Sequence, residues 1–419
     1  MSSAPRPSRA GVPAAAFAVV MAGVAAALHL GKLPPAVPAL RATLGIGLVE
    51  AGFLLSLVQL AGMTLGLLVG LAADTIGLRR SMLVGLTVLT VASVLGGAVG
   101  AADPGAHAVF ELLALRALEG VGFLLTVMPG PGLIRAQSVP HTEKAALGLW
   151  AAYMPLGVAL ALLCGPALIA WLGWPGWWWV LSLVSAAAAA WVALAVPADG
   201  CRVRVAAVSR EDGVARLRAT LGARGPRTLA LAFAVYSSQW IAVIGFLPAI
   251  YADADVPAGW SAALTALAAA LNIVGNVTGG RLLQRGVAPE RLLRWGFAIM
   301  ALGGVAAFAQ IGQNATASLP PVLRYLAVCM FSLGGGVVPA TLFMLSVRIA
   351  PGPSTVSATV GMMQQASSLG QFIAPPVVAW IAHRVGGWEW TWIVTLACSL
   401  AGIALATRLS PASPHAGTA

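Results

Sequence analysis

The hydrophobic positions of this chain fall into long uninterrupted runs, and short stretches between the runs hold the polar and charged residues. Each run is close to the ~20 residues that an α-helix needs to cross a bilayer. Twelve runs can be drawn, at about 14–40, 49–72, 81–100, 108–134, 145–171, 177–196, 228–251, 260–283, 292–311, 321–349, 356–383 and 388–409. The runs lack the alternation of β-strands, so the pattern predicts helices.

Composition supports a chain that lies in lipid. Hydrophobic residues make up 59% of the 419 residues and charged residues only 9%, whereas soluble domains carry roughly 25% charged residues. In a bilayer, backbone polar groups must be satisfied within helices or closed barrels. We therefore expect an all-α membrane protein with twelve transmembrane helices, and we expect no cofactor and no metal.

The net charge of +11 is interpreted here as a topology signal, so no nucleic-acid partner is expected. With the amino terminus placed in the cytoplasm, nineteen of the 24 Lys and Arg residues fall in cytoplasmic segments. Arg41, Arg324 and Arg384 fall on the opposite side, and Lys32 and Arg116 fall inside helices. We predict cytoplasmic termini, and the Ala- and Arg-rich composition favours the inner membrane of a prokaryote.

A basic segment separates the first six predicted helices from the last six. Residues 198–227 hold seven arginines, and we predict a cytoplasmic linker between an N-terminal bundle, 1–197, and a C-terminal bundle, 228–419. The stretch from Ser209 to Leu221 fits either an amphipathic helix on the membrane surface or a solvated basic tether.

The two halves share special residues at a constant offset of 210 positions. The pairs are Pro38 with Pro248, Gly70 with Gly280, Pro129 with Pro339, and Pro166 with Pro376. The pairs indicate a repeat, although glycine and proline are common enough in such helices for chance matches. In transporters built from repeats the solute site lies near the membrane midplane, between the repeats.

The polar stretch after the second run reads Gly70-Leu-Ala-Ala-Asp74-Thr-Ile-Gly77-Leu-Arg79-Arg80. It resembles the loop motif G-x-x-x-D-x-x-G-x-[RK]-[RK] of the major facilitator superfamily. The resemblance implies two six-helix bundles and a conformational gate at the cytoplasmic face, formed by Gly70, Asp74, Gly77, Arg79 and Arg80. The alternative is that Asp74 is a solvated loop acid. The corresponding stretch of the second half has Gln284 instead of the acid, so the gate is expected on one side only.

A second motif, Arg116-Ala-Leu-Glu119-Gly120-Val-Gly122, is similar to the family's R-x-x-[QE]-G-x-G. Arg116 and Glu119 share a helix face. A charge at the centre of a membrane helix costs about 2.5–3.5 kcal/mol, so such charges should pair or face a cavity. Proton-coupling candidates are Arg116, Glu119 and His29, and a purely structural ion pair is the alternative.

Three shorter segments are similar to the cyanate and nitroimidazole transporter branch of the family. They are Met128-Pro129 with Gly148-Leu149-Trp150, Phe246-Leu-Pro-Ala-Ile-Tyr251, and Gly334-Gly335-Gly336 before Pro339. The candidates for solute binding are polar residues of the predicted helices, namely His29, Lys32, Tyr153, Gln239, Asn272, Gln364 and Gln371.

The environment of Lys32 indicates the charge of the solute. If the first helix continues to Pro38, Lys32 lies in a cavity, and since Glu119 already has Arg116, the missing negative charge points to a small anion such as a carboxylate. His29 would be its proton-linked neighbour. If the helix ends near Gly31, Lys32 extends to the outer interface instead. The other alternative is a neutral or cationic drug-like solute, with Lys32 neutralised by Glu50 or Glu119.

We therefore expect a monomeric secondary transporter in contact with lipid, driven by a proton or a counter-solute. The ATP-binding pattern G-x-x-x-x-G-K-[ST] is absent from the sequence. A membrane-embedded enzyme would need a constellation such as H-E-x-x-H, which is also absent. A passive channel is a third alternative, and counterflow exchange in liposomes separates it from a carrier.

Overall fold

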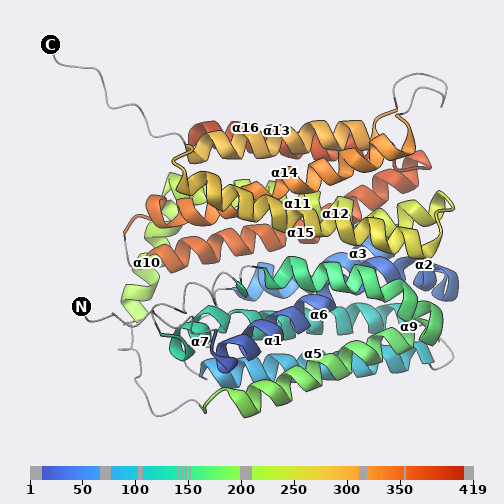
Figure 1. The fold of residues 1–419 in the computed structure, drawn as a ribbon, viewed down its shortest axis with the longest axis horizontal. Helices are drawn as coiled ribbons and strands as arrows, with labels where there is room; N and C mark the ends of the chain where they lie inside the picture. The colour runs from blue at the N-terminus through green and yellow to red at the C-terminus, as the bar shows by residue number, and fades with distance from the viewer. Residues whose placement is uncertain are drawn as a thin grey trace, which may run out of the picture.

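The structure is a computed structural model, and it describes residues 12–66, 77–101, 107–139, 142, 146, 149–150, 152–198, 210–310, 319–352 and 355–409. The elements of this described part are helices, with no strand among them. Figure 1 shows the helices of the first half of the chain as one group and those of the second half as another, stacked side by side.

The first half begins with α1 (Ala14–Gly31), which runs on into α2 (Leu33–Leu44). It continues with α3 (Leu48–Ser56) and the 3₁₀ turn η1 (Leu57–Gln59), then α5 (Leu78–Ala101), α6 (Ala108–Val127), α7 (Gly130–Gln137) and α9 (Tyr153–Ala195). The second half consists of α11 (Arg224–Asp253), α12 (Ala258–Gln284), α13 (Pro289–Phe308), α14 (Pro321–Ile349), α15 (Val356–Val385) and α16 (Thr391–Arg408).

Helix α9 contains two of the predicted membrane crossings. Its 43 residues are interrupted at Gly173, whose φ of 71° and ψ of 169° are not helical, and Pro175 follows. A residue with positive φ is far less strained as glycine than with a side chain. The arm before Gly173 packs on α1 and the arm after it packs on α5, so the chain reverses direction there.

The predicted number of crossings agrees with the helices. Nine helices of the described part are long and apolar enough to span a membrane, and α9 supplies two crossings. Helices α6 and α15 make up the remainder, although α6 carries Glu111, Arg116 and Glu119, and α15 is rich in Gln and Ser. The three charges of α6 and the polar side chains of α15 set these two helices apart from the other nine, and α6 holds much of the site described below.

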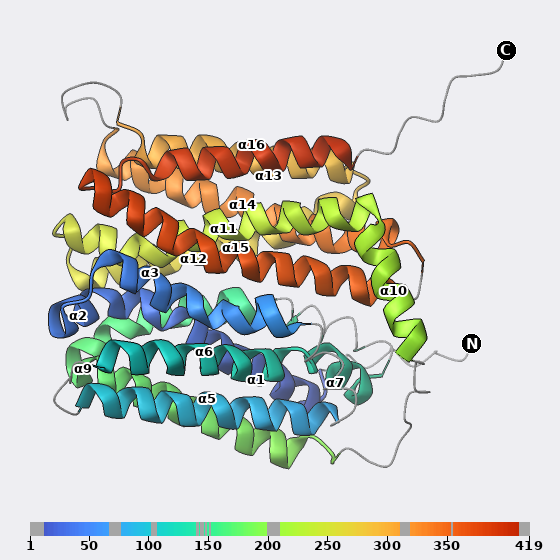
Figure 2. The same cartoon turned by 180° about the vertical axis from the view of Figure 1, so that it is seen from behind.

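Helix α10 (Arg210–Gly222) lies across the end of the molecule where α1 begins and α16 ends (Figures 1 and 2). The described part of this stretch is helical, and its position on the membrane surface stays a prediction. The predicted linker as a whole stays a prediction, because residues 199–209 lie outside the described part.

The two halves pack together mainly at the opposite end, where α2 lies. One apolar core there combines Leu40 and Ile46 of the first half with Phe246 and Ala249 of α11. Another combines Leu30 and Leu162 with Val243 and Leu247. At the α10 end, by contrast, the core around Val19, Met82 and Ile134 contains residues of the first half alone.

Candidate functional site

Four ionisable side chains meet inside the first half. His29 lies on α1, Lys32 lies between α1 and α2, and Arg116 and Glu119 lie one turn apart on α6. None of the four is more than 2% exposed, and among the described residues Lys32, Arg116 and Glu119 are the fully charged side chains classed as buried. Burial of this kind is costly unless each charge has partners.

Glu119 connects the other three residues. Its Oε2 accepts a hydrogen bond from Arg116 Nη1 at 2.8 Å, and its Oε1 accepts one from Lys32 Nζ. His29 Nδ1 lies 3.6 Å from Oε1, without a hydrogen bond of its own. Lys32 therefore does have a carboxylate partner, and the prediction that it lacks one is wrong, because the two oxygens of Glu119 serve both cations.

The alternative in which the Lys32 side chain reaches the outer interface is also wrong. The chain continues as α2 as far as Leu44, and the Lys32 side chain is fully buried. Glu119 is its carboxylate partner, so the alternative partner Glu50 is wrong too. Glu50 lies in the first turn of α3 and is exposed.

The helix break at Lys32 explains part of this arrangement. Pro34 and Pro35 lack the N–H groups that would bond the carbonyls of Leu30 and Gly31, so the helix cannot satisfy its own backbone there. Arg116 supplies donors instead: Nη2 lies 3.4 Å from Leu30 O, and Nη1 lies 2.6 Å from His29 O. Arg116 therefore has a structural role at the break in addition to its contact with Glu119.

Helices α5 and α9 complete the walls of the cluster. Lys32 Nζ lies 3.4 Å from Ser93 Oγ and 4.5 Å from the centre of the Trp178 ring. His29 Nε2 lies 2.7 Å from Ser185 Oγ. Besides Glu119, Lys32 therefore contacts a hydroxyl and an aromatic face, and His29 contacts a hydroxyl.

The glycine of the second motif has a packing role. A Cβ on Gly120 would lie 2.3 Å from the carbonyl oxygen of Val58, so only glycine lets α6 approach η1 this closely. Arg116 Nε donates to Leu54 O at 3.1 Å across the same contact. The motif thus brings Arg116 and Gly120 of α6 against α3 and η1, which also pack on α15 of the second half.

The positions that correspond to the cluster in the second half are uncharged. At the offset of 210, Lys32, Arg116 and Glu119 correspond to Ala242, Leu326 and Cys329. The offset partner of His29 is Gln239, and Gln239 Oε1 accepts from Ser399 of α16 at 3.0 Å, much as His29 contacts Ser185. Of the two halves, only the first therefore has charged residues at these positions.

The remaining predicted residues do not join the cluster. Tyr153 packs on Trp150, with ring centres 4.4 Å apart. Asn272 bonds Tyr236 at 3.1 Å within the second half, and Gln364 is half-buried on α15. Their roles in solute binding stay predictions.

Gln371 takes part in a contact between the halves that our sequence reasoning missed. Gln59 Nε2 on η1 donates to Gln371 Oε1 on α15 at 3.1 Å, and Ser368 Oγ donates to Gln59 Oε1 at 3.2 Å. Gln59 is 5% exposed. Its position in the middle of the second apolar run was a signal that could have identified it.

Comparison with known proteins shows where this arrangement belongs. The sequence matches the family description Major Facilitator Superfamily over residues 15–367 and again over residues 229–419. The chain belongs to the major facilitator superfamily. It is thus an integral membrane transporter and not an enzyme, and the predicted all-α fold class is confirmed.

Two relatives illustrate the match. A puromycin resistance protein of Streptomyces alboniger is 35% identical over 141 residues, which cover 33% of this chain and 26% of that protein. The chain therefore matches about a quarter of that relative's length. A crystal structure of a bacterial homologue of the human lysosomal transporter Spinster has a TM-score of 0.68, covers 95% of each chain and is 14% identical, which shows the fold alone.

The superfamily's loop motif is only partly described by the structure. Gly77 has a φ of 104°, and Arg79 Nη2 donates to Ala193 O on α9 at 2.7 Å. Arg80 lies next to it in the first turn of α5, while Gly70 and Asp74 lie outside the described residues. The gate therefore stays a prediction.

Proposed function

We propose that this superfamily member is a proton-coupled secondary transporter of a small organic solute, and that His29, Lys32, Arg116 and Glu119 form its coupling site. One observation carries the proposal: the buried charges of the described residues gather in one cluster, while the corresponding positions of the second half are Ala242, Leu326 and Cys329. The described part of the second half forms the same kind of helix bundle without a buried charged side chain, so the scaffold alone does not require the cluster. Buried charges in membrane helices are costly and usually functional.

Glu119 is the group that carries the coupled proton. Protonation of its carboxylate would remove both ion pairs at once, because Lys32 and Arg116 share this one acid. The released cations sit at the break between α1 and α2, and α2 packs directly on α11 of the second half. A change of charge at Glu119 can therefore bias how the two halves pack.

An amphipathic organic molecule is the solute that the contacts between the halves support best. Among the described residues, the polar contacts between the halves in the interior are made by neutral groups, Gln59 with Gln371 and Ser368. Apolar residues of both halves, such as Leu30, Leu162 and Val243, form a shared core. The relative named for puromycin resistance supports the same class of solute, and puromycin is the natural first probe.

A small organic anion is the second candidate. The cluster holds two cations, Lys32 and Arg116, against one carboxylate, which leaves one excess positive charge in the first half. The segments similar to the cyanate and nitroimidazole branch support this candidate as well. A carboxylate solute would compete with Glu119 for Lys32.

Proteoliposomes with a pH-sensitive dye inside test the coupling. Puromycin added to wild-type vesicles should move protons, and Glu119→Gln should abolish that proton movement while puromycin counterflow continues. The double variant Lys32→Met/Glu119→Gln keeps one excess positive charge in the cluster and serves if the single variant folds poorly. Glu111→Gln, an exposed acid on the same helix, is the matched control. Proton movement that persists in both Glu119 variants would exclude Glu119 as the coupling group.

Binding by the purified protein separates the two solute classes. Thermal stabilisation by puromycin that survives Lys32→Ala supports the amphipathic solute. Stabilisation by benzoate that Lys32→Ala removes supports the anion instead.

A further inference from the structure

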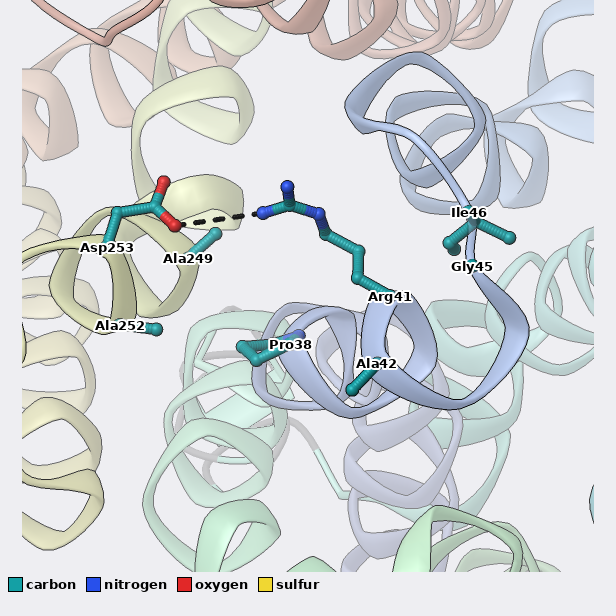
Figure 3. A pocket seen from close by; sticks show the side chains of 8 residues that line it. All are labelled: Pro38, Arg41, Ala42, Gly45, Ile46, Ala249, Ala252 and Asp253. Atoms are coloured by element: carbon teal, nitrogen blue, oxygen red, sulfur yellow. Dashed lines mark ion pairs between the residues drawn. The ribbon is translucent and has the colours of Figure 1, made fainter.

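An ion pair joins the two halves of the molecule at the α2 end. Arg41 lies in the last turn of α2, and Asp253 is the last residue of α11. Arg41 Nη1 lies 3.7 Å from Asp253 Oδ1, and Figure 3 shows the two side chains extended toward one another from their separate helices. Because the helices belong to different halves, this contact exists only while the halves meet at this end.

A third residue fixes the carboxylate. Trp388, between α15 and α16, donates from Nε1 to Asp253 Oδ2 at 3.0 Å. The Trp388 ring also packs on Phe246 of α11, with ring centres 5.0 Å apart. Trp388, Phe246 and Asp253 all belong to the second half, so these contacts hold Asp253 in place whether or not Arg41 is near.

The two charged residues lie at the C-terminal ends of their helices, and these ends affect the two charges differently. The C-terminus of a helix carries partial negative charge, which favours a cation and disfavours an anion there. Arg41 is thus well placed at the end of α2, whereas Asp253 at the end of α11 needs a cation opposite. Separation of the halves would leave Asp253 with Trp388 but without that cation.

Water reaches this contact. A cavity of about 410 Å³ borders the pair and is lined by residues of both halves, among them Pro38, Ile46 and Ala249 (Figure 3). The Arg41 and Asp253 side chains are 37% and 48% exposed. Salt therefore screens the pair, while the apolar core that contains Leu40 and Phe246 beneath it is unaffected by screening.

We propose that Arg41, Asp253 and Trp388 form a latch that favours closure of the α2 end and must release when that end opens. The latch is independent of the solute and of the coupling site, because none of its residues belongs to the Glu119 cluster. Its contribution to the free energy should be small, as for exposed ion pairs generally. It therefore shifts the equilibrium between the closed and open arrangements without fixing either one.

Distances between spin labels test the latch directly. The four native cysteines are replaced by serine, and labels are attached at Ala101→Cys and Ala258→Cys, exposed positions at this end on α5 and α12. Electron–electron distance distributions of the full-length protein in nanodiscs then give the ratio of open to closed arrangements. Arg41→Ala and Asp253→Asn should each raise that ratio about two- to fivefold.

Three comparisons decide the matter. The charge exchange Arg41→Asp/Asp253→Arg should restore the closed population relative to either single charge reversal, and Asp255→Asn, the same change two residues along, should leave the ratio unchanged. Raising salt from about 0.01 M to about 1 M, which shortens the Debye length from about 30 Å to about 3 Å, should shift the wild type and not Arg41→Ala. An unchanged ratio in both single variants, or an equal shift in Asp255→Asn, would overturn the latch.

Discussion

Glu119 is the residue on which the buried cluster depends. It accepts hydrogen bonds from Lys32 and Arg116, and it is the nearest carboxylate to His29. The spacing of Arg116 and Glu119 on one helix face could be predicted from the sequence alone. The contact with Lys32 was only one of two alternatives, Glu119 or Glu50, and the sequence could not decide between them because the contact depends on how α1 packs against α6.

The stability of single variants should follow this shared carboxylate. Glu119→Gln leaves two buried cations with no acid, and we expect a loss of about 3–5 kcal/mol of stability. Lys32→Met leaves Arg116 and Glu119 as a neutral pair with an apolar neighbour, so its loss should be less than about half as large. Thermal melting of the purified protein in detergent gives the order, and a larger loss for Lys32→Met would contradict it.

At the scale of helices, uninterrupted apolar runs were sufficient to locate nearly every element. Two of the departures from these runs have clear physical causes. The first run is one span but two helices, because Pro34 and Pro35 break the hydrogen-bond ladder after Lys32. The runs 145–171 and 177–196 join as α9, because the chain reverses at Gly173 with almost no intervening residues. Arg116, which donates to carbonyls at the first break, is a tertiary partner that no local pattern reveals.

Because α6 approaches η1 closely at Gly120, replacing this glycine by alanine should affect stability differently from the same change at Gly280. A Cβ at Gly120 would lie 2.3 Å from Val58 O, so Gly120→Ala must push the helices apart and should cost about 1–3 kcal/mol. Gly280, inside α12, has no heavy atom within 4 Å of such a Cβ, so Gly280→Ala should be neutral or stabilising by up to about 1 kcal/mol. Melting temperatures of the two variants measure the contrast, and equal effects would mean that α6 can shift freely.

At the scale of the whole molecule, the arrangement of charges predicts which side of the membrane each end faces. Nineteen of 24 basic residues fall on one side when the termini are placed in the cytoplasm. A single cysteine at Ser209→Cys in a cysteine-free background should resist an impermeant thiol reagent added to intact cells, and react after permeabilisation. A cysteine at Ala258→Cys, at the start of α12, is the control that the reagent should reach from outside. Labelling of position 209 in intact cells would contradict the orientation.

The loop motif predicts a gate at the α10 end that complements the contacts at the α2 end. If Asp74 holds the halves closed there, Asp74→Asn should change the transport rate and the ratio of the two arrangements more than the affinity for solute. The spin-label pair at Ala101→Cys and Ala258→Cys, together with binding and counterflow assays, measures all three. Unchanged turnover and an unchanged ratio would leave Asp74 as a solvated loop acid.

The hydrogen bond between Gln59 and Gln371 gives the last prediction, because it crosses from one half to the other in the interior. Gln59→Ala removes the partner of both Gln371 and Ser368 in the arrangement seen here. A buried hydrogen bond contributes about 1 kcal/mol, so the population of this arrangement should fall about fivefold relative to the other. The combination of Gln59→Ala with Gln371→Ala should cost less than the sum of the two single changes, since they share one bond. Thr64→Val, an exposed site on the same membrane span, Leu48–Gly66, is the control. Strict additivity would show that Gln59 and Gln371 do not act together.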